Sequence, residues 1–310
     1  MYSLPLCGHA LRGLLRGVLL VLLVLLGIPL AIIVGVGLCL TDLLSRGRAV
    51  RPDKVSTPAV RASDPVSVVI PTWNGRELLA MSLPPLAEAI RQHGHPEDEV
   101  VVMDNASEDD TSEYLASLQE EMPFLRTIRL DRNEGFAGAT NEGARQARNP
   151  ALVLLNNDMV VEPDFLQPLL DAFDHEPGVF GVSSQIDFID TGKPRWETGK
   201  VHGEFAWGCV KLFHLDRFEE DLHYPIFFAG GGASAYDRGR FLQLGGFDEA
   251  VFSPVYIEDV DLGYRAWRRG WPSVLAPASR VHHKHRGTTR RRWSEATIHS
   301  FFVKNLAALV

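Results

Sequence analysis

The stretch Ala151-Leu-Val-Leu-Leu-Asn-Asn-Asp158 decides the fold of this chain. Five apolar residues run into two asparagines and an aspartate, and such a short apolar run is typical of a strand buried on both faces, as in a parallel sheet. The polar triplet then follows the carboxyl end of the strand, where open α/β sheets bind their ligands. A carboxylate there can hold a hard divalent cation that carries phosphate groups. An asparagine-rich turn has the same composition, so this stretch alone leaves both interpretations open.

The segments around this stretch alternate between strand and helix patterns. Strands are predicted at residues 66–70, 100–103 and 125–130, and helices at residues 76–92, 108–121, 137–148 and 163–173. Alternation at this spacing indicates βαβ units and a parallel sheet. The pattern weakens afterwards, and residues 184–225 are expected to form irregular loops and antiparallel excursions. Two later helices are expected, at residues 259–269 and 294–310.

Most of the apolar excess lies near the N-terminus. Residues 17–40 carry no charged side chain and are rich in Leu, Val and Ile, which is long enough for a helix to cross a bilayer. A cleaved signal peptide is the alternative, but this stretch is longer than a signal core and no convincing small-residue cleavage site follows it. We therefore expect an N-terminal tail at residues 1–16, a transmembrane anchor at 17–40 and a linker at 41–65.

Basic residues beside the span predict its orientation. Arg12 and Arg16 precede it, and a larger group follows it: Arg46, Arg48, Arg51 and Lys54. The larger group is expected in the cytoplasm, which predicts a single-pass protein of the cell (inner) membrane with the bulk of the chain on the cytoplasmic side. The three cysteines make no disulfide framework, in agreement with that side. The Asn-x-Ser/Thr site at Asn105 follows the strand predicted at residues 100–103, at an end of the sheet where ligands are expected to bind, and a glycan there would block binding.

The net charge of −8 argues against a general nucleic-acid binder, and no nucleic-acid partner is expected. Basic residues gather near the C-terminus, at Lys284, Arg286, Arg290, Arg291 and Arg292. This group is suited to phosphates or an anionic membrane surface, and equally to a solvated charged face.

Three of the predicted strands end in polar residues. The first runs into Thr72 and Asn74, the second into Asp104, and the fourth into Asp158. The carboxyl ends of parallel strands lie side by side, so these residues are expected to line one crevice. Asp104 can accept hydrogen bonds from a base or ribose hydroxyls, and Asp158 can hold a metal ion. Near them, Gly135 lets the backbone come close to a ligand or serves a turn that needs glycine.

A second acidic site lies at Glu258-Asp-Val-Asp261, where the predicted late helix begins. Carboxylates there suit the helix dipole and can cap free N–H groups, and an aspartate so fixed can also take a proton from a hydroxyl. His282 and His283 follow, and one of them could complete a metal shell or contact a diphosphate. The spacing of a zinc site is missing.

The joint order of these motifs resembles the family-two inverting glycosyltransferases, which have the GT-A fold, and within them the bacterial rhamnosyltransferase-like members that build surface polysaccharides. The motifs are Val-Ser-Val-Val-Ile-Pro-Thr-Trp-Asn, Met-Asp-Asn-Ala-Ser, Arg-Asn-Glu-Gly-Phe-Ala-Gly-Ala-Thr-Asn, Leu-Leu-Asn-Asn-Asp, Gly-Gly-Phe-Asp-Glu and Glu-Asp-Val-Asp-Leu. The resemblance implies an α/β fold of the GT-A nucleotide-diphospho-sugar transferase type, with a mostly parallel central sheet flanked by helices and one N-terminal transmembrane helix. It places the GT-A domain at residues 66–289. The helical tail at 290–310 is then either membrane-associated or the start of a longer segment.

The resemblance also implies roles for the residues at the strand ends. The nucleotide would be bound by Pro71, Thr72, Asn74, Asp104, Arg132, Gly135 and Asn157. Asp158 would hold Mg²⁺ or Mn²⁺ against the diphosphate, with His282 or His283 as the late metal or phosphate histidine. Asn156 stands where the commonest Asp-x-Asp form has its first aspartate, which leaves one carboxylate fewer.

The late acidic site would carry the reaction. Asp259 would be the catalytic base, with Gly231, Gly232 and Glu258 in the vicinity of the donor and acceptor sugars. The implied reaction moves a sugar from a nucleotide-diphosphate donor of UDP or dTDP type to a hydroxyl of a saccharide or lipid-linked acceptor. Transfer of one or few sugars is expected, because no Gln precedes Arg292-Trp293 to complete the Gln-x-x-Arg-Trp motif of processive synthases.

Two other functions are compatible with parts of the pattern. A non-catalytic, membrane-tethered carbohydrate-binding protein would not need both acidic sites. A nucleotidyltransferase would carry a glycine-rich loop with Lys or Arg after the first strand, and the loop at residues 71–76 fits that poorly.

Overall fold

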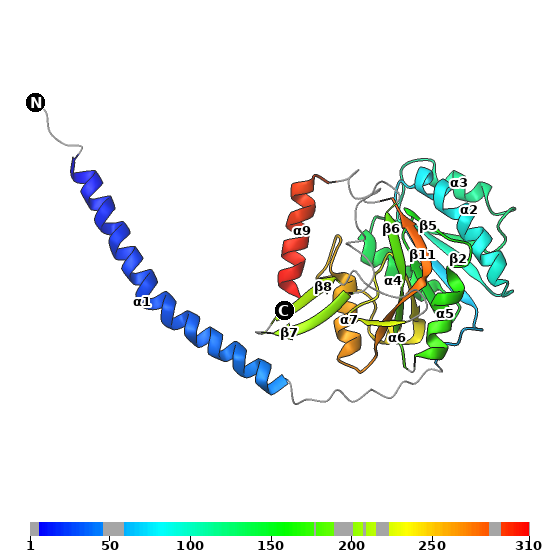
Figure 1. Ribbon diagram of the computed structural model, residues 1–310. Coiled ribbons are helices and arrows are strands. Elements are labelled where there is room, and N and C mark those ends of the chain that lie inside the picture. The colour runs from blue at the N-terminus through cyan, green and yellow to red at the C-terminus, as the bar shows by residue number, and fades with distance from the viewer. Residues whose placement is uncertain are drawn as a thin grey trace, which may run out of the picture. The chain divides into compact units, whose positions relative to one another are not determined.

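The computed structural model describes residues 6–45, 59–176, 178–188, 201–206, 209–214, 223–284 and 293–309. The chain divides into two compact units, of which one contains helix α1 (Leu6–Ser45) and the other contains the α/β sheet (Figure 1). Most of the predicted linker, including residues 46–58, lies outside the described residues.

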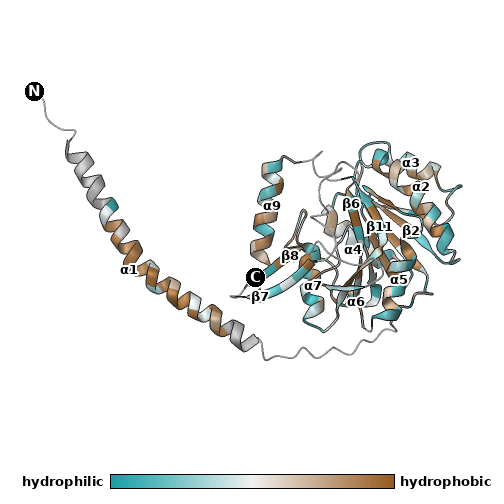
Figure 2. Cartoon of the chain, in the orientation of Figure 1, coloured by the Kyte–Doolittle hydropathy of each residue, from teal (hydrophilic) through white to brown (hydrophobic). Residues whose placement is uncertain are grey.

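Helix α1 is longer than the predicted span, with 40 residues. Within it, Arg16–Leu40 is long and apolar enough to cross a membrane, a test that a signal sequence near the N-terminus also passes. Apolar residues surround the helix on every side (Figure 2). Pro29 lies inside the helix, a position that membrane helices tolerate.

Nine strands of the described residues form one sheet in the order β3-β2-β1-β4-β10-β6-β11-β5, with β9 paired to β11. The strands are β1 (Val66–Thr72), β2 (Glu99–Asp104), β3 (Leu125–Arg129), β4 (Ala151–Leu155), β5 (Met159–Val161), β6 (Gly181–Phe188), β9 (Tyr224–Ile226), β10 (Ala233–Asp237) and β11 (Ser273–His283). Strands β1 to β4 run parallel to one another, and β6 runs parallel to β11. Strands β10, β5 and β9 run antiparallel to their neighbours. The predicted mostly parallel sheet is confirmed.

Helices cover both faces of this sheet (Figure 1). One layer holds α2 (Arg76–His93), α3 (Thr111–Ser117) and α5 (Leu166–His175), and the other holds α4 (Gly135–Gln146), α6 (Arg238–Gln243) and α7 (Glu258–Trp267). Successive side chains of a strand point to opposite faces. Val68 and Ile70 therefore pack into the first layer, and Val69 between them packs into the second.

Two predicted helices differ from the observed ones in their bounds. Helix α3 is shorter than the predicted 108–121, and Ser107 is not its cap, since the Ser107 hydroxyl accepts a hydrogen bond from the Asn74 N–H at 2.9 Å. That bond joins the loop after β2 to the loop after β1. Helix α5 begins at Leu166, because the residues after Pro163 first form a turn in which the Phe165 N–H bonds the Glu162 carbonyl.

The prediction of irregular structure from residue 184 onward was wrong for strand β6. This strand continues through Phe188 between β10 and β11, with Ser183, Ser184 and Gln185 buried in the sheet. Polar residues interrupted the apolar pattern there, although the Ser184 hydroxyl is paired with the Ser279 hydroxyl at 2.8 Å. Beyond it, β7 (Val201–Ala206) and β8 (Cys209–His214) pair in a separate two-stranded sheet.

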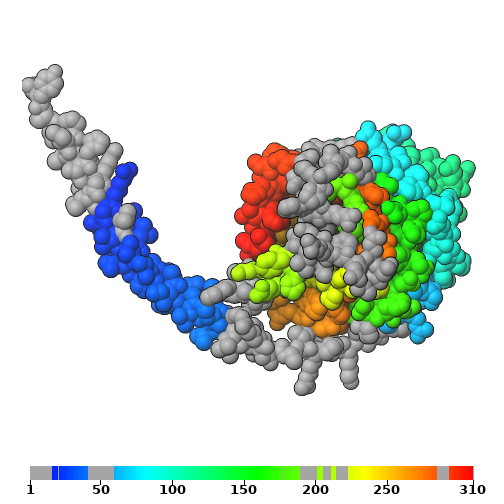
Figure 3. Space-filling model, viewed as in Figure 1, coloured from blue at the N-terminus to red at the C-terminus, as the bar shows by residue number. Residues whose placement is uncertain are grey.

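The predicted C-terminal helix is confirmed as α9 (Glu295–Ala308), with the Ser294 hydroxyl capping the Thr297 N–H at 3.2 Å. Its residues form one edge of the α/β unit in the space-filling view (Figure 3). Ile298 and Asn305 are buried. The basic cluster of the C-terminal region lies largely outside the described residues, which resume at Trp293.

Candidate active site

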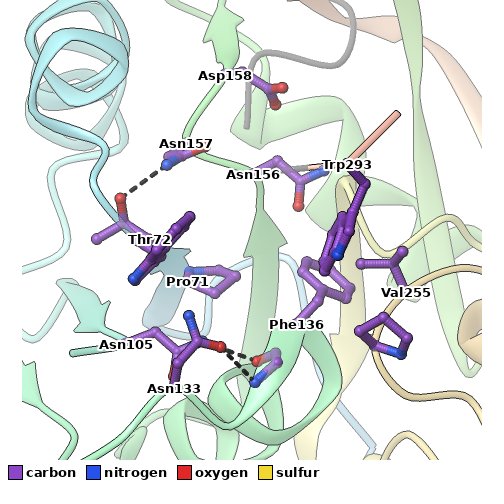
Figure 4. Close-up of a pocket in the computed structure, with 13 residues that line it drawn as sticks. Pro71, Thr72, Asn105, Asn133, Phe136, Asn156, Asn157, Asp158, Val255 and Trp293 are labelled. Atoms are coloured by element: carbon purple, nitrogen blue, oxygen red, sulfur yellow. Dashed lines mark hydrogen bonds between the residues drawn. The ribbon is translucent and has the colours of Figure 1, made fainter. Parts of the chain in front are cut away.

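The carboxyl ends of β2, β1 and β4 meet at one edge of the sheet, as predicted. Thr72 is in register with Asp104 across the β1–β2 pair, and Val69 with Leu154 across the β1–β4 pair. A cavity of about 130 Å³ opens there (Figure 4). Its walls are Pro71, Thr72, Trp73, Asn105, Asn133, Gly135, Phe136, Asn156, Asn157, Asp158, Pro254, Val255 and Trp293.

Five of the predicted site residues line this cavity: Pro71, Thr72, Gly135, Asn157 and Asp158. They come from the ends of β1 and β4 and from the start of α4. The structure thus brings together residues that lie up to 87 positions apart in the sequence, as the parallel arrangement of these strands requires.

The loop after β1 is held tightly against the loop after β4. The Asn157 side-chain amide donates to the Thr72 hydroxyl at 2.8 Å (Figure 4). A Cβ at Gly75 would lie 2.1 Å from that hydroxyl oxygen and 2.6 Å from the Asn157 amide nitrogen, so only glycine fits. Sequence reasoning did not select Gly75, although an Asn-Gly pair directly after a strand is the signal of a tight turn.

A network of amides shapes the opposite wall. The Asn105 side chain donates to the Asn133 side-chain oxygen at 3.3 Å and to the Gly135 carbonyl at 3.1 Å, and it accepts from the Glu134 N–H at 2.8 Å. Gly135 has a φ of +76°, a conformation that favours glycine. Asn105 was expected in this pocket, whereas Asn133 was missed as a lining residue, since an asparagine in a loop is a common turn residue.

Asp104 is fully buried, and both of its carboxylate oxygens accept hydrogen bonds from the protein. The donors are the Ser107 N–H at 2.8 Å, the Ser112 hydroxyl at 2.6 Å and the Arg129 guanidinium at 2.6 Å. Burial alone would raise the pKa of Asp104, but these hydrogen bonds outweigh it and lower the pKa below its ordinary value. Asp104 does not line the cavity, so its predicted contact with a nucleotide stays a prediction.

Two other predicted nucleotide-binding residues also lie outside the cavity wall. Arg132 is paired with Glu134 at 3.2 Å, and its side chain is 84% exposed. Asn74 adopts a left-handed φ of 48° and accepts the Glu108 N–H at 2.7 Å, which fixes the loop after β1.

Of the two late histidines, His283 lies against the predicted metal residue. Its Nε2 is 3.4 Å from the Asp158 carboxylate, and its ring stacks on Phe188. His282 Nε2 is 3.1 Å from the Glu162 carboxylate instead. The two rings diverge because neighbouring residues of strand β11 point to opposite faces of the sheet.

The donor atoms present fit a weakly held divalent cation. The described residues contain no group of three or more His, Cys, Asp or Glu side chains suited to a metal ion. Asp158 and His283 together offer a carboxylate, which suits Mg²⁺ or Mn²⁺, and an imidazole, which favours a transition metal. A cation held by these two side chains would keep its other coordination positions for other ligands.

Asp259 lies in the first turn of α7, where backbone N–H groups hold its carboxylate. The donors are the N–H groups of Gly231 at 3.2 Å and of Val260 at 2.9 Å. The adjacent Gly232 carbonyl accepts the Asn156 N–H at 2.8 Å. The predicted sugar-vicinity glycines therefore connect the late acidic site to the end of β4.

Burial governs the charge of both acids at this helix start. It raises the pKa of Asp259, although the N–H donors partly oppose it. Glu258 is 7% exposed, and burial together with the charge of Asp259 raises its pKa well above the ordinary value. A carboxylate with a raised pKa is a better proton acceptor near neutral pH.

Residues 67–241 match the family described as Glycosyl transferase family 2. The chain belongs to this family. Membership disfavours the nucleotidyltransferase alternative.

Curated glycosyltransferases that resemble the chain come from Drosophila melanogaster and from bacteria. N-acetylgalactosaminyltransferase 6 of Drosophila melanogaster is 29% identical over 82% of this chain and 39% of its own length. The uncharacterized glycosyltransferase YfnE of Bacillus subtilis is 32% identical over 66% of this chain and 60% of its own. The N-acetylglucosaminyl-diphospho-decaprenol L-rhamnosyltransferase of Mycobacterium tuberculosis is 28% identical over 64% of this chain and 71% of its own. The chain thus spans only part of the first two relatives.

Solved structures share the fold of this family 2 chain. GalNAc-T7, solved with UDP, GalNAc and Mn²⁺, aligns with a TM-score of 0.60 at 22% identity over 71% of this chain and 43% of its own. The mannosyltransferase of Pyrobaculum calidifontis, solved with GDP-Man and Mn²⁺, aligns with a TM-score of 0.53 at 20% identity over 84% of this chain and 70% of its own. The predicted GT-A-like α/β fold is confirmed.

Proposed function

We propose that this chain is a membrane-anchored, inverting glycosyltransferase that moves a sugar from a nucleotide-diphosphate donor, of UDP or dTDP type, to a hydroxyl of a saccharide or lipid-linked acceptor. The observation that carries the proposal is the connection between two acidic sites. Asp158 lines the cavity beside Asn156, and Asn156 is bonded to the same glycine pair that holds Asp259. Asp259 itself does not line the cavity, and the proposal places the donor sugar and the acceptor hydroxyl between this carboxylate and the cavity.

The donor nucleotide is assigned to the cavity at the ends of β1 and β4. Pro71 and Thr72 supply one wall, and the amides of Asn105 and Asn133 supply another. Amides both donate and accept hydrogen bonds, which suits the edges of a base and ribose hydroxyls. The two relatives solved with UDP or GDP-Man support a nucleotide-sugar donor.

Asp158 and His283 are assigned to a divalent cation, with Mn²⁺ favoured over Mg²⁺ because one ligand is an imidazole. When bound, such an ion supplies Lewis-acid stabilisation of the charge that develops on the diphosphate. Both related structures were solved with Mn²⁺, in agreement with this assignment.

Asp259 is assigned as the general base. It removes the proton from the acceptor hydroxyl while that oxygen bonds to the anomeric carbon of the donor sugar. The bond from the anomeric carbon to the diphosphate oxygen breaks on the opposite side, and the nucleoside diphosphate leaves with the electron pair. Such in-line attack inverts the anomeric configuration, and no covalent enzyme intermediate is needed.

We also assign the anchor to α1. Its 25-residue apolar segment suits a single bilayer crossing, and the basic residues that follow it favour a cytoplasmic position for the rest of the chain. An anchored chain would share the membrane with a lipid-linked acceptor.

A donor screen tests the function. The full chain in detergent is mixed with Mn²⁺ and a panel of nucleotide sugars, and release of nucleoside diphosphate is measured with and without candidate acceptors. We expect thermal stabilisation by at least one nucleotide and acceptor-dependent release with one donor. Saccharide binding without turnover of any donor would support the non-catalytic carbohydrate-binding alternative.

A further inference from the structure

One side chain of the C-terminal helix holds a segment that precedes α7. Asn305 of α9 is fully buried. Its side-chain amide lies 2.9 Å from the Val255 carbonyl, 3.1 Å from the Tyr256 carbonyl and 3.3 Å from the Phe252 carbonyl. A single –NH₂ group, which has two hydrogens, thus lies within hydrogen-bond distance of three backbone carbonyls in residues 252–256, so that at least one hydrogen is shared.

That segment has a conformation that needs such support. Tyr256 and Ile257 are consecutive residues with left-handed φ values of 76° and 75°. Side chains with a Cβ disfavour this region, and a β-branched isoleucine does so strongly. Such backbone persists only where surrounding contacts hold it.

Helix α9 provides further contacts to the same segment. The Tyr256 ring meets the Phe302 ring edge-on, with centroids 6.5 Å apart. Phe252, Ile257 and Val260 form a small apolar cluster against which Leu309 packs. These contacts fix the position of the helix, and the Asn305 amide fixes the path of the backbone.

The segment borders both halves of the candidate site. Pro254 and Val255 line the cavity wall. Ile257 is the residue that caps α7, and Asp259 follows two positions later, in the first turn. A shift of the segment would therefore move the cavity wall and the carboxylate together.

We propose that Asn305 is a positioning residue of the active site, through which α9 sets the wall formed by Pro254 and Val255 and the placement of Asp259. The proposal rests on the function assigned above to the cavity and to Asp259. Under this proposal, helix α9 is needed for the geometry of the active site.

Three variants separate hydrogen bonding from packing. Asn305→Leu keeps the volume of the side chain and removes the donor. Asn305→Asp keeps the shape and places carboxylate oxygens against three carbonyl oxygens. Lys304→Ala, at an exposed neighbouring position of the same helix, is the matched control.

Transfer by the full chain is measured together with UDP binding by calorimetry and with the melting temperature. For Asn305→Leu we expect kcat to fall at least about tenfold, which corresponds to about 1.4 kcal/mol of transition-state stabilisation, while the UDP dissociation constant changes less than about threefold. The kcat of Asn305→Asp is expected to fall further than that of Asn305→Leu. The kcat of Lys304→Ala is expected to match that of the unchanged chain. The proposal would be overturned if the folded Asn305 variants had the same kcat as the unchanged chain. It would also be overturned if weaker UDP binding and a smaller amount of folded protein accounted for the whole fall in transfer.

Hydrogen exchange of the peptide covering residues 252–260 keeps the test independent of activity. We expect faster exchange there in Asn305→Leu than in the unchanged chain, with the β1 and β4 peptides unaffected. Unchanged exchange would overturn the positioning role whatever the activity. Faster exchange in a chain that transfers no sugar would leave the positioning of the segment standing and refute the proposed function instead.

Discussion

The Gly231 N–H and the Asp259 carboxylate are joined by a hydrogen bond of 3.2 Å across 28 residues of sequence. The next glycine, Gly232, bonds the Asn156 N–H through its carbonyl. A loop of small residues therefore stands between the late acidic site and the end of the central strand β4. This relationship is the structural basis for assigning the two acids to one reaction.

Asp259→Asn is expected to lower the transfer rate by about 10²–10⁴-fold, because an amide cannot take the acceptor proton. The side-chain oxygen of the asparagine can still accept the Gly231 N–H, so the loop should keep its position. Calorimetric binding of the nucleoside diphosphate should remain within about threefold. Loss of nucleotide binding in this variant would point to a structural role for Asp259.

Glu258→Gln is expected to stabilise the protein at pH 8. The folded-state pKa of Glu258 lies well above the ordinary 4.5 because the group is buried, so its contribution to stability is full below about pH 4.5 and is lost as the pH rises through the folded pKa. Glutamine stays neutral and avoids that loss. At pH 8 we expect the melting temperature of Glu258→Gln to be about 2–4 °C higher than that of the unchanged chain. This difference should become smaller as the pH is lowered toward 4.5. A difference that does not vary with pH would show that Glu258 has the same pKa in the folded and the unfolded chain, and burial would then not raise it.

His283→Ala is expected to raise the Mn²⁺ concentration needed for half-maximal transfer by about tenfold or more, because the proposed metal site loses one of its two protein ligands. His282→Ala is the matched control, since His282 meets Glu162 rather than Asp158. Asp158→Ala should raise the metal requirement most steeply. Equal effects of the two histidine variants would remove His283 from the metal site.

The anchor assignment predicts that the full chain, made in a bacterial host, stays in the membrane after alkaline carbonate extraction. A C-terminal tag should resist protease added to spheroplasts and become sensitive on lysis. The intact mass of the purified chain should show that the N-terminal residues are still present. A mass that lacks α1 would identify a signal peptide, and digestion in intact spheroplasts would reverse the orientation.

Local patterns were sufficient to predict the first half of the sheet. Each of β1, β2 and β4 is a short apolar run followed by polar residues, and parallel pairing then fixes where those residues meet. The helix around Asp259 was similarly marked by its acidic first turn. Pro71, Thr72, Asn157 and Asp158 could therefore be placed in one crevice from sequence.

Long-range pairing was beyond such patterns. Strand β10 inserts antiparallel beside β4, and β6 hides its polar residues in the sheet, so neither has a local signal. Val255 and Trp293 reach the cavity from far along the chain. The Arg129 partner of Asp104 depends on the same tertiary contacts, and it converts an apparently available carboxylate into a bonded one.

In the proposed reaction, Asp158 and Asp259 serve two sides of one donor sugar. A crystal structure of the full chain with Mn²⁺ and an unreactive nucleotide-sugar analogue tests it most directly, with anomalous scattering to locate the metal. We expect Mn²⁺ beside Asp158 and His283 against the diphosphate, and the Asp259 carboxylate facing the anomeric carbon from the opposite side. Metal bound away from Asp158, or a sugar that Asp259 does not face, would contradict the claim.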